Sequence, residues 1–212
     1  MARFACLLFL QMALLPLTLC SQRFSAGAVL GINASQIDGD DQFGYRQFGI
    51  VGGLQGIAQL SNRLDFKLEL LYSQRGARAG ANEKEKADYF ANVRLQYVET
   101  PFLLDYKLLE NWDGHYFLHL QSGVQYARLL ESKVKEGFKK PSSEEAFTIG
   151  AQQDNFQRNE LSWVVGFSFY PFPRVHISLR HVLGLTPLLQ RQEPDIRQLR
   201  SYYLQLRVGY RL

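Results

Sequence analysis

The sequence predicts an all-β fold, an eight-stranded antiparallel up-and-down transmembrane β-barrel. Three observations point to this class. Apolar and polar side chains alternate in eight separate segments, as in strands whose two faces meet different surroundings. Short and long connections between these segments alternate along the chain. The chain also begins like a secretory signal peptide.

Residues 1–22 have the layout of a signal peptide, which would leave residues 23–212 as the barrel domain. Arg3 precedes an apolar run that extends from Phe4 to Leu19, and Ser21-Gln22-Arg23 form a polar exit. This order of charge, apolar stretch and polar end is typical of an exported protein. A buried first helix is the alternative interpretation.

Composition limits the function classes. The 212 residues suit one domain, and a formal net charge of +4 gives no reason to expect a nucleic-acid partner. The two cysteines are Cys6 and Cys20, both in the predicted signal segment. The mature protein would then contain neither disulfides nor thiol chemistry. Leu19 before Cys20 argues against a lipidated cysteine, because that modification requires a small residue there.

The most informative segment extends from Leu64 to Tyr72. Its odd positions Asp65, Lys67 and Glu69 are ionisable, whereas its even positions are apolar and end in an aromatic. Such a strand fits a membrane barrel, whose lumen and lipid face require opposite chemistry. Similar alternation marks the other segments, and together the predicted strands are approximately residues 24–35, 47–60, 64–75, 92–108, 115–128, 159–170, 174–184 and 200–212.

The connections distinguish a membrane barrel from a soluble one. The links after the second, fourth and sixth strands are short, whereas those after the other strands are long and polar. Sorted links are typical of outer-membrane barrels, with short periplasmic turns and long extracellular loops. Aromatic residues near the strand ends suggest interfacial girdles, and these are Tyr72, Tyr106, Tyr116, Tyr126, Phe169, Tyr202 and Tyr210.

A narrow barrel has a lumen that its own side chains can fill. Acids and bases that face this lumen should pair, because an isolated buried charge is heavily penalised. We therefore predict a plug of salt bridges and not an open pore, with glycines at lumenal positions providing room for long side chains. The residues expected at the centre of this lumen charge network are Lys67, Glu69, Glu99, Arg180 and Arg207.

No residue pattern indicates catalysis, a metal or a cofactor. His115 and His119 lie on one face of a strand but about 13 Å apart, too far to share one ion. His181 is expected to face lipid near the extracellular rim, with no nearby serine to complete a dyad. We therefore expect a protein that is not an enzyme.

The predicted loops carry charges of both signs. The bases are Arg75, Arg78, Lys84, Lys86, Lys133, Lys135, Lys139 and Lys140, and glutamates are interspersed among them. The mixture suggests a solvated surface. Contact with lipid phosphates or with a partner protein is the sharper alternative.

Five segments of the mature chain form an ordered set of motifs: residues 31–40, 68–76, 97–104, 179–185 and the closing Leu206-Arg-Val-Gly-Tyr-Arg-Leu212. In these segments the chain resembles the PorT-like family of bacterial outer-membrane β-barrels. His181 stands where the family has an aromatic residue, and Leu212 stands where the family ends in Phe. The resemblance implies the fold and an outer-membrane location, and one class of members serves protein secretion.

Three functions remain open at this point. The first is an integral outer-membrane barrel with a structural or interaction role, which contacts membrane lipids and an envelope or secretion protein and is a monomer. The second is a narrow transport or secretion-accessory component. The third is a soluble periplasmic barrel that binds an apolar ligand.

Overall fold

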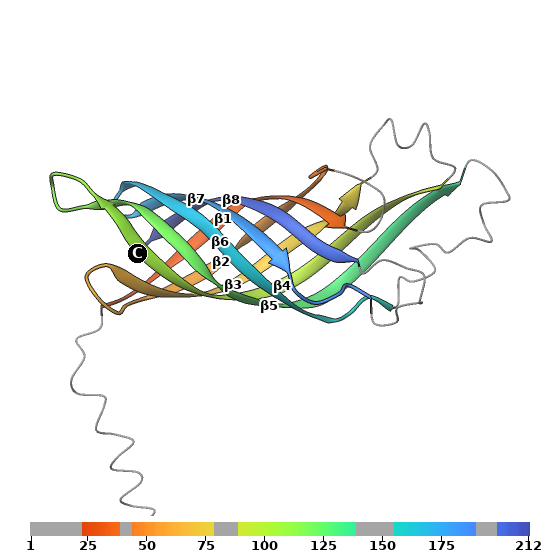
Figure 1. Cartoon of the computed structure of the whole chain (residues 1–212), viewed down its shortest axis with the longest axis horizontal. Helices are drawn as coiled ribbons and strands as arrows, with labels where there is room; N and C mark the ends of the chain where they lie inside the picture. The colour runs from red at the N-terminus through yellow and green to blue at the C-terminus, as the bar shows by residue number, and fades with distance from the viewer. Residues whose placement is uncertain (1–22, 39–43, 79–88, 139–154, 190–198) are drawn as a thin grey trace, which may run out of the picture.

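A computed structural model describes residues 23–38, 44–78, 89–138, 155–189 and 199–212 (Figure 1). The predicted signal peptide lies outside this part of the chain. The described residues form eight strands. Their bounds are β1 Phe24–Asp38, β2 Gln47–Gln59, β3 Leu64–Arg78, β4 Tyr89–Glu110, β5 Tyr116–Phe138, β6 Asn159–Phe172, β7 Val175–Gly184 and β8 Arg200–Arg211.

The strands close into one barrel in sequence order, which confirms the predicted fold class. Every neighbouring pair is antiparallel, and β1 pairs with β8, with Gly31 opposite Arg207. Closure leaves no strand edge where all eight strands meet, so the backbone groups there find their partners within the barrel. Beyond Arg128, β5 forms a ladder with β4 alone among the described residues. No helix in the described ranges is long and apolar enough to cross a membrane.

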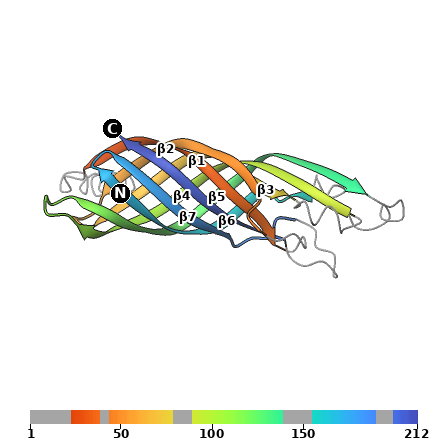
Figure 2. The same cartoon turned by 90° about the horizontal axis from the view of Figure 1, so that it is seen from above.

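The two ends of the barrel differ. The short links β2–β3, β4–β5 and β6–β7 lie at one end, here called the turn end, where the C-terminus also lies (Figures 1 and 2). The β1–β2, β3–β4, β5–β6 and β7–β8 connections leave from the opposite end, called the loop end. The longest strands, β4 and β5, extend beyond the others at the loop end (Figure 2).

These extensions correct the predicted boundaries. The fourth and fifth strands were expected over residues 92–108 and 115–128, but β4 covers Tyr89–Glu110 and β5 covers Tyr116–Phe138. β3 likewise continues to Arg78. The added residues of β3 alternate in the opposite sense: Ala77 is buried inside, whereas Arg78 is exposed outside. Within the predicted fourth strand, Val93 is likewise buried and Arg94 exposed. The outward Arg78 had suggested a loop.

Candidate functional site

The middle of the lumen is occupied by Glu69 between two arginines. Arg180 donates two hydrogen bonds to the Glu69 carboxylate, both of 2.8 Å, and Arg207 donates two more, of 2.7 and 3.2 Å. All three side chains are at most 1% exposed. Paired charge-assisted hydrogen bonds of this kind fix both partners in position and in orientation.

A second charged group lies nearer the turn end. The Lys67 Nζ atom is 2.9 Å from Asp105 Oδ2 and donates to the Tyr170 hydroxyl at 2.9 Å. His119 Nδ1 is 2.7 Å from the same Asp105 oxygen, and its ring stacks on Tyr170. Close by in register, Lys107 pairs with Asp65 at 2.9 Å.

A third group lies toward the loop end and is centred on Arg75. Its guanidinium donates to both oxygens of Glu160, at 2.9 and 3.0 Å, and its Nε lies 3.6 Å from Glu99. The guanidinium also lies over the rings of Tyr97 and Tyr203, at 3.8 and 4.9 Å from their centroids. Cation–π contact of this kind adds to the ion pairs.

Arg75 stood at the end of the predicted third strand and was counted among the loop charges, and that second interpretation is wrong. Arg75 is 1% exposed, because β3 continues past it and directs it into the lumen. The even spacing of Arg75 from Asp65, Lys67 and Glu69 could have indicated this position, since residues two, four or six apart share one face of a strand. The signal was hidden because the apolar face ends at Tyr72.

The five residues expected at the centre of the network fall into three separate groups. Glu69, Arg180 and Arg207 lie together. Lys67 instead pairs with Asp105, and Glu99 lies beside Arg75. The three groups and the Lys107–Asp65 pair together contain five bases and five acids, so their formal charges balance; they are Lys67, Arg75, Lys107, Arg180, Arg207, Asp65, Glu69, Glu99, Asp105 and Glu160.

Two lumenal glycines provide space for the arginines. A Cβ atom at Gly31 would lie 2.8 Å from Arg207 Cγ, and one at Gly166 would lie 2.8 Å from Arg180 Cγ. Each would also approach the backbone oxygen of the neighbouring strand to 2.4 Å or less. Such distances are too short for any real side chain, so only glycine allows this packing.

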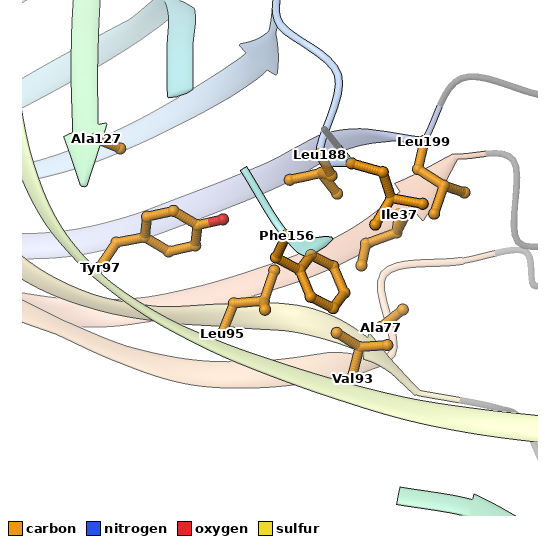
Figure 3. Packing of buried hydrophobic residues seen from close by; sticks show 10 residues of the cluster. Ile37, Ala77, Val93, Leu95, Tyr97, Ala127, Phe156, Leu188 and Leu199 are labelled. Atoms are coloured by element: carbon orange, nitrogen blue, oxygen red, sulfur yellow. The ribbon is translucent and has the colours of Figure 1, made fainter. Parts of the chain in front are cut away.

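An apolar cluster lies above the Arg75 group at the loop end (Figure 3). Phe156 is 3% exposed, and Figure 3 shows its ring pointing toward Ile37, Ala77 and Val93. The Gln157 amide donates to the Leu188 carbonyl, and Phe156 forms a β-bridge with Leu189. Segments from the β5–β6 and β7–β8 connections therefore fold into the mouth. Sequence periodicity does not reveal this, because these residues lie outside the strands.

The outer surface carries the opposite chemistry. Exposed apolar side chains cover it, for example Leu30, Leu54 and Phe167, each more than half exposed. A polar lumen inside an apolar exterior is the reverse of a soluble barrel that binds an apolar ligand. The alternative of a soluble periplasmic protein is therefore wrong.

The histidines form no metal site. No group of three potential ligands that could hold an ion occurs among the described residues. His119 and His176 flank Tyr170 within the lumen. His181 lies on the outer face, where its Nε2 atom is 3.0 Å from the Tyr45 hydroxyl. Sequence spacing gave no hint of this contact, because β1 and β8 separate the two residues in the barrel order.

A family model described as "Outer membrane protein beta-barrel domain" matches residues 14–190. Among solved structures, the chain is similar to Ail of Yersinia pestis, with 12% identity, a TM-score of 0.47 and coverage of 89% of this chain and 98% of that one. Neisserial surface protein A has 11% identity and a TM-score of 0.49, with coverage of 89% of this chain and 97% of that one. OprG of Pseudomonas aeruginosa has 11% identity and a TM-score of 0.38, with coverage of 89% of this chain and 94% of that one. A comparison with curated proteins found no match.

Proposed function

Because the chain belongs to the outer-membrane β-barrel domain family and is an integral outer-membrane protein, we propose that it is a non-enzymatic envelope protein that interacts through its loop end. In this proposal the turn end faces the periplasm and the loop end faces outward. Residues 1–22 act as a removable signal peptide, and the barrel is a monomer that contacts outer-membrane lipids directly.

The filled lumen is the observation that supports this role. Ion pairs occupy it from Lys67 near the turn end through Glu69 to Arg75, and the Phe156 cluster lies above them. Every base named there has a carboxylate within 4 Å, which favours a structural interior over a path for solutes. The outer surface and the loop end are then the parts of the protein that remain accessible to other molecules.

Crosslinking in intact cells tests the interaction role. A photoreactive residue placed within the 139–154 connection should give a discrete higher-mass adduct with an envelope or secretion protein. The same residue at Asn62, in a turn, serves as the matched control and should give a different pattern or none. Identical adducts from both positions, or none from the connection, would count against a loop-end partner.

A narrow transport or secretion-accessory role is the second candidate. The ordered motifs that resemble PorT-like barrels favour it, since one class of those proteins serves secretion. Planar bilayers separate the two functions: the filled lumen predicts no steady current from the purified protein. Reproducible unitary currents would refute the plugged interior and support transport.

A further inference from the structure

A cluster of bases covers the outer face of the barrel where β3, β4 and β5 extend past the other strands. Register places Arg78, Asn92 and Lys135 in one cross-strand row. The next row toward the membrane contains Arg94 and Lys133 beside Gly76. All four bases are exposed, whereas their strand neighbours Val93 and Ala77 are buried in the cluster around Phe156.

The rows below this basic patch mark the edge of the lipid-facing surface. Leu68, Phe102 and Val124 form a wholly apolar row. Tyr72 lies two outward-facing rows nearer the loop end. Its hydroxyl donates a hydrogen bond to Gln96 at 2.5 Å and accepts one from Gln74 at 2.9 Å. A tyrosine with its ring on apolar residues and its hydroxyl in a polar row is typical of a membrane interface.

The basic patch lies just outside the interface that Tyr72 marks, within reach of lipid headgroups. Gly76 is four residues beyond Tyr72, which is about 13 Å along a strand and about 10 Å along the membrane normal at the usual tilt. The polar layer of a bilayer is about 5–8 Å thick on each side of the hydrocarbon core. The first basic row thus lies at the outer border of this polar layer, and the long side chains of Arg94 and Lys133 can extend back toward the phosphate groups.

Geometry also provides space for an anion. A cavity of about 370 Å³ is lined by the four bases together with Asn92, Gln47 and Val93. Glu131 is the carboxylate that pairs with this patch among the described residues, at 2.8 Å from Lys133 Nζ. The Lys133 side chain is 59% exposed and the Glu131 side chain is 44% exposed, so this ion pair is solvated and weak. Among the described residues of this patch, four bases stand against one acid, so this part of the surface is positively charged.

We propose that Arg78, Arg94, Lys133 and Lys135 form a binding site for the phosphate groups of a membrane lipid. The guanidinium groups would hold phosphate oxygens by paired hydrogen bonds, and the lysines would add charge. The acyl chains of the same lipid would lie along the apolar face below, past Tyr72 toward Leu68 and Phe102. This site concerns the barrel wall, and it is independent of the loop-end partner proposed above.

Native mass spectrometry of the folded protein in nonionic detergent tests the site. Micelles are doped with diphosphorylated lipid A or, separately, with phosphatidylcholine. The wild-type protein should retain lipid A and show at least tenfold weaker retention of phosphatidylcholine. The double variant Arg94→Glu/Lys133→Glu should lose at least tenfold in lipid A affinity, and Arg94→Lys/Lys133→Arg should stay within threefold of wild type.

The control is Arg174→Glu, a single charge reversal of the same kind on an exposed residue in the β6–β7 turn. It should bind lipid A like the wild type. Heat-modifiable gel mobility of every variant verifies that the barrel has folded. An equal loss in Arg174→Glu and in the double variant would overturn the site, and so would unchanged binding by the folded double variant.

Two further arms exclude other anions. Millimolar inorganic phosphate should not displace the lipid, because it lacks the apolar part that the wall binds. Heparin, a soluble sulfated polysaccharide, should compete no better than phosphate. Full displacement by inorganic phosphate would reassign the patch to a free anion. Tighter binding of heparin than of lipid A would reassign it to a soluble polyanion, and either result would refute the lipid site.

Discussion

The membrane-spanning belt is the part of the barrel between the turn end and the row of Tyr72, and the loop-end extension is the part of β3, β4 and β5 beyond that row. The same strands form both, but polar and apolar side chains occupy opposite faces in the two. In the belt, Glu69 and Arg207 lie inside and Leu68 and Leu206 lie outside. In the extension, Val93 and Leu95 are buried inside and Arg94 is exposed outside. The two-residue period continues along β3 and β4, while a register shift opposite Gln96 and Tyr97 interrupts it in β5. Beyond the row of Tyr72 the outer face becomes polar, and beyond Arg75 the inner face becomes apolar.

This exchange follows from the solvent on the outside of the barrel. Hydrocarbon surrounds the belt, so apolar side chains face outward and the polar groups gather in the lumen. Water or headgroups surround the extension, so the ordinary arrangement of a soluble protein returns, with an apolar interior and a polar surface. The ion pairs around Glu69 and the apolar cluster around Phe156, here called the apolar cap, consequently fill consecutive parts of one lumen.

Removing the shared acid of the belt should have the largest effect. Glu69→Ala leaves Arg180 and Arg207 buried side by side without a counterion, which should cost about 3–5 kcal/mol of folding stability. Urea unfolding in detergent, followed by heat-modifiable mobility, measures the loss. Glu110→Ala, an exposed acid at the end of β4, is the control and should change stability by less than about 0.5 kcal/mol. Equal midpoints for both variants would contradict a structural role for Glu69.

Removing one of the two bases should cost less. Arg207→Ala loses two charge-assisted hydrogen bonds but leaves Glu69 paired with Arg180 and removes the repulsion between the two buried guanidinium groups, so the net loss should be about 2 kcal/mol. The same urea titration should rank this variant between Glu69→Ala and wild type. An unchanged midpoint would remove Arg207 from the network.

The apolar cap should respond locally. Phe156→Ala removes a buried ring, a change worth about 3 kcal/mol in a core, but the ring lies outside the barrel strands. We expect faster hydrogen exchange at the amides of Gln157 and Leu188, which join the cap, and a shift of less than about 1 kcal/mol in global stability. Phe172→Ala, with its ring 65% exposed near the turn end, should leave those amides unchanged. Uniform acceleration over all strands would instead make the cap part of the barrel's cooperative unit.

The boundary between the two regions should show the smallest effect. Tyr72→Phe removes the hydroxyl that joins Gln74 and Gln96, for an expected loss of about 1 kcal/mol. Tyr210→Phe, on the outer face at the turn end, provides the comparison. A larger loss from Tyr210→Phe would argue against Tyr72 as the point where the faces exchange.

Sequence patterns predicted the belt far better than the extension. Alternation assigned Leu64 to Tyr72 to their correct faces, since lipid and lumen impose a clear contrast on each strand. The same criterion failed for Arg75, because it treated the end of the outward apolar run as the end of the strand. Of the proposed central cluster, the pairing of Glu69 with two arginines could be anticipated from charge and face, but the partners of Lys67 and Glu99 depend on register between strands.

The amino-acid sequence by itself determined the strand period, the number of strands, the sorted connections and the polar character of the lumen. Each of these follows from local alternation against lipid or water. Only the tertiary structure decided which charges meet, that Phe156 and Leu188 enter the mouth, and that four bases gather above Tyr72. Those outcomes depend on stagger between strands and on chain segments outside them, and neither leaves a periodic trace in the sequence.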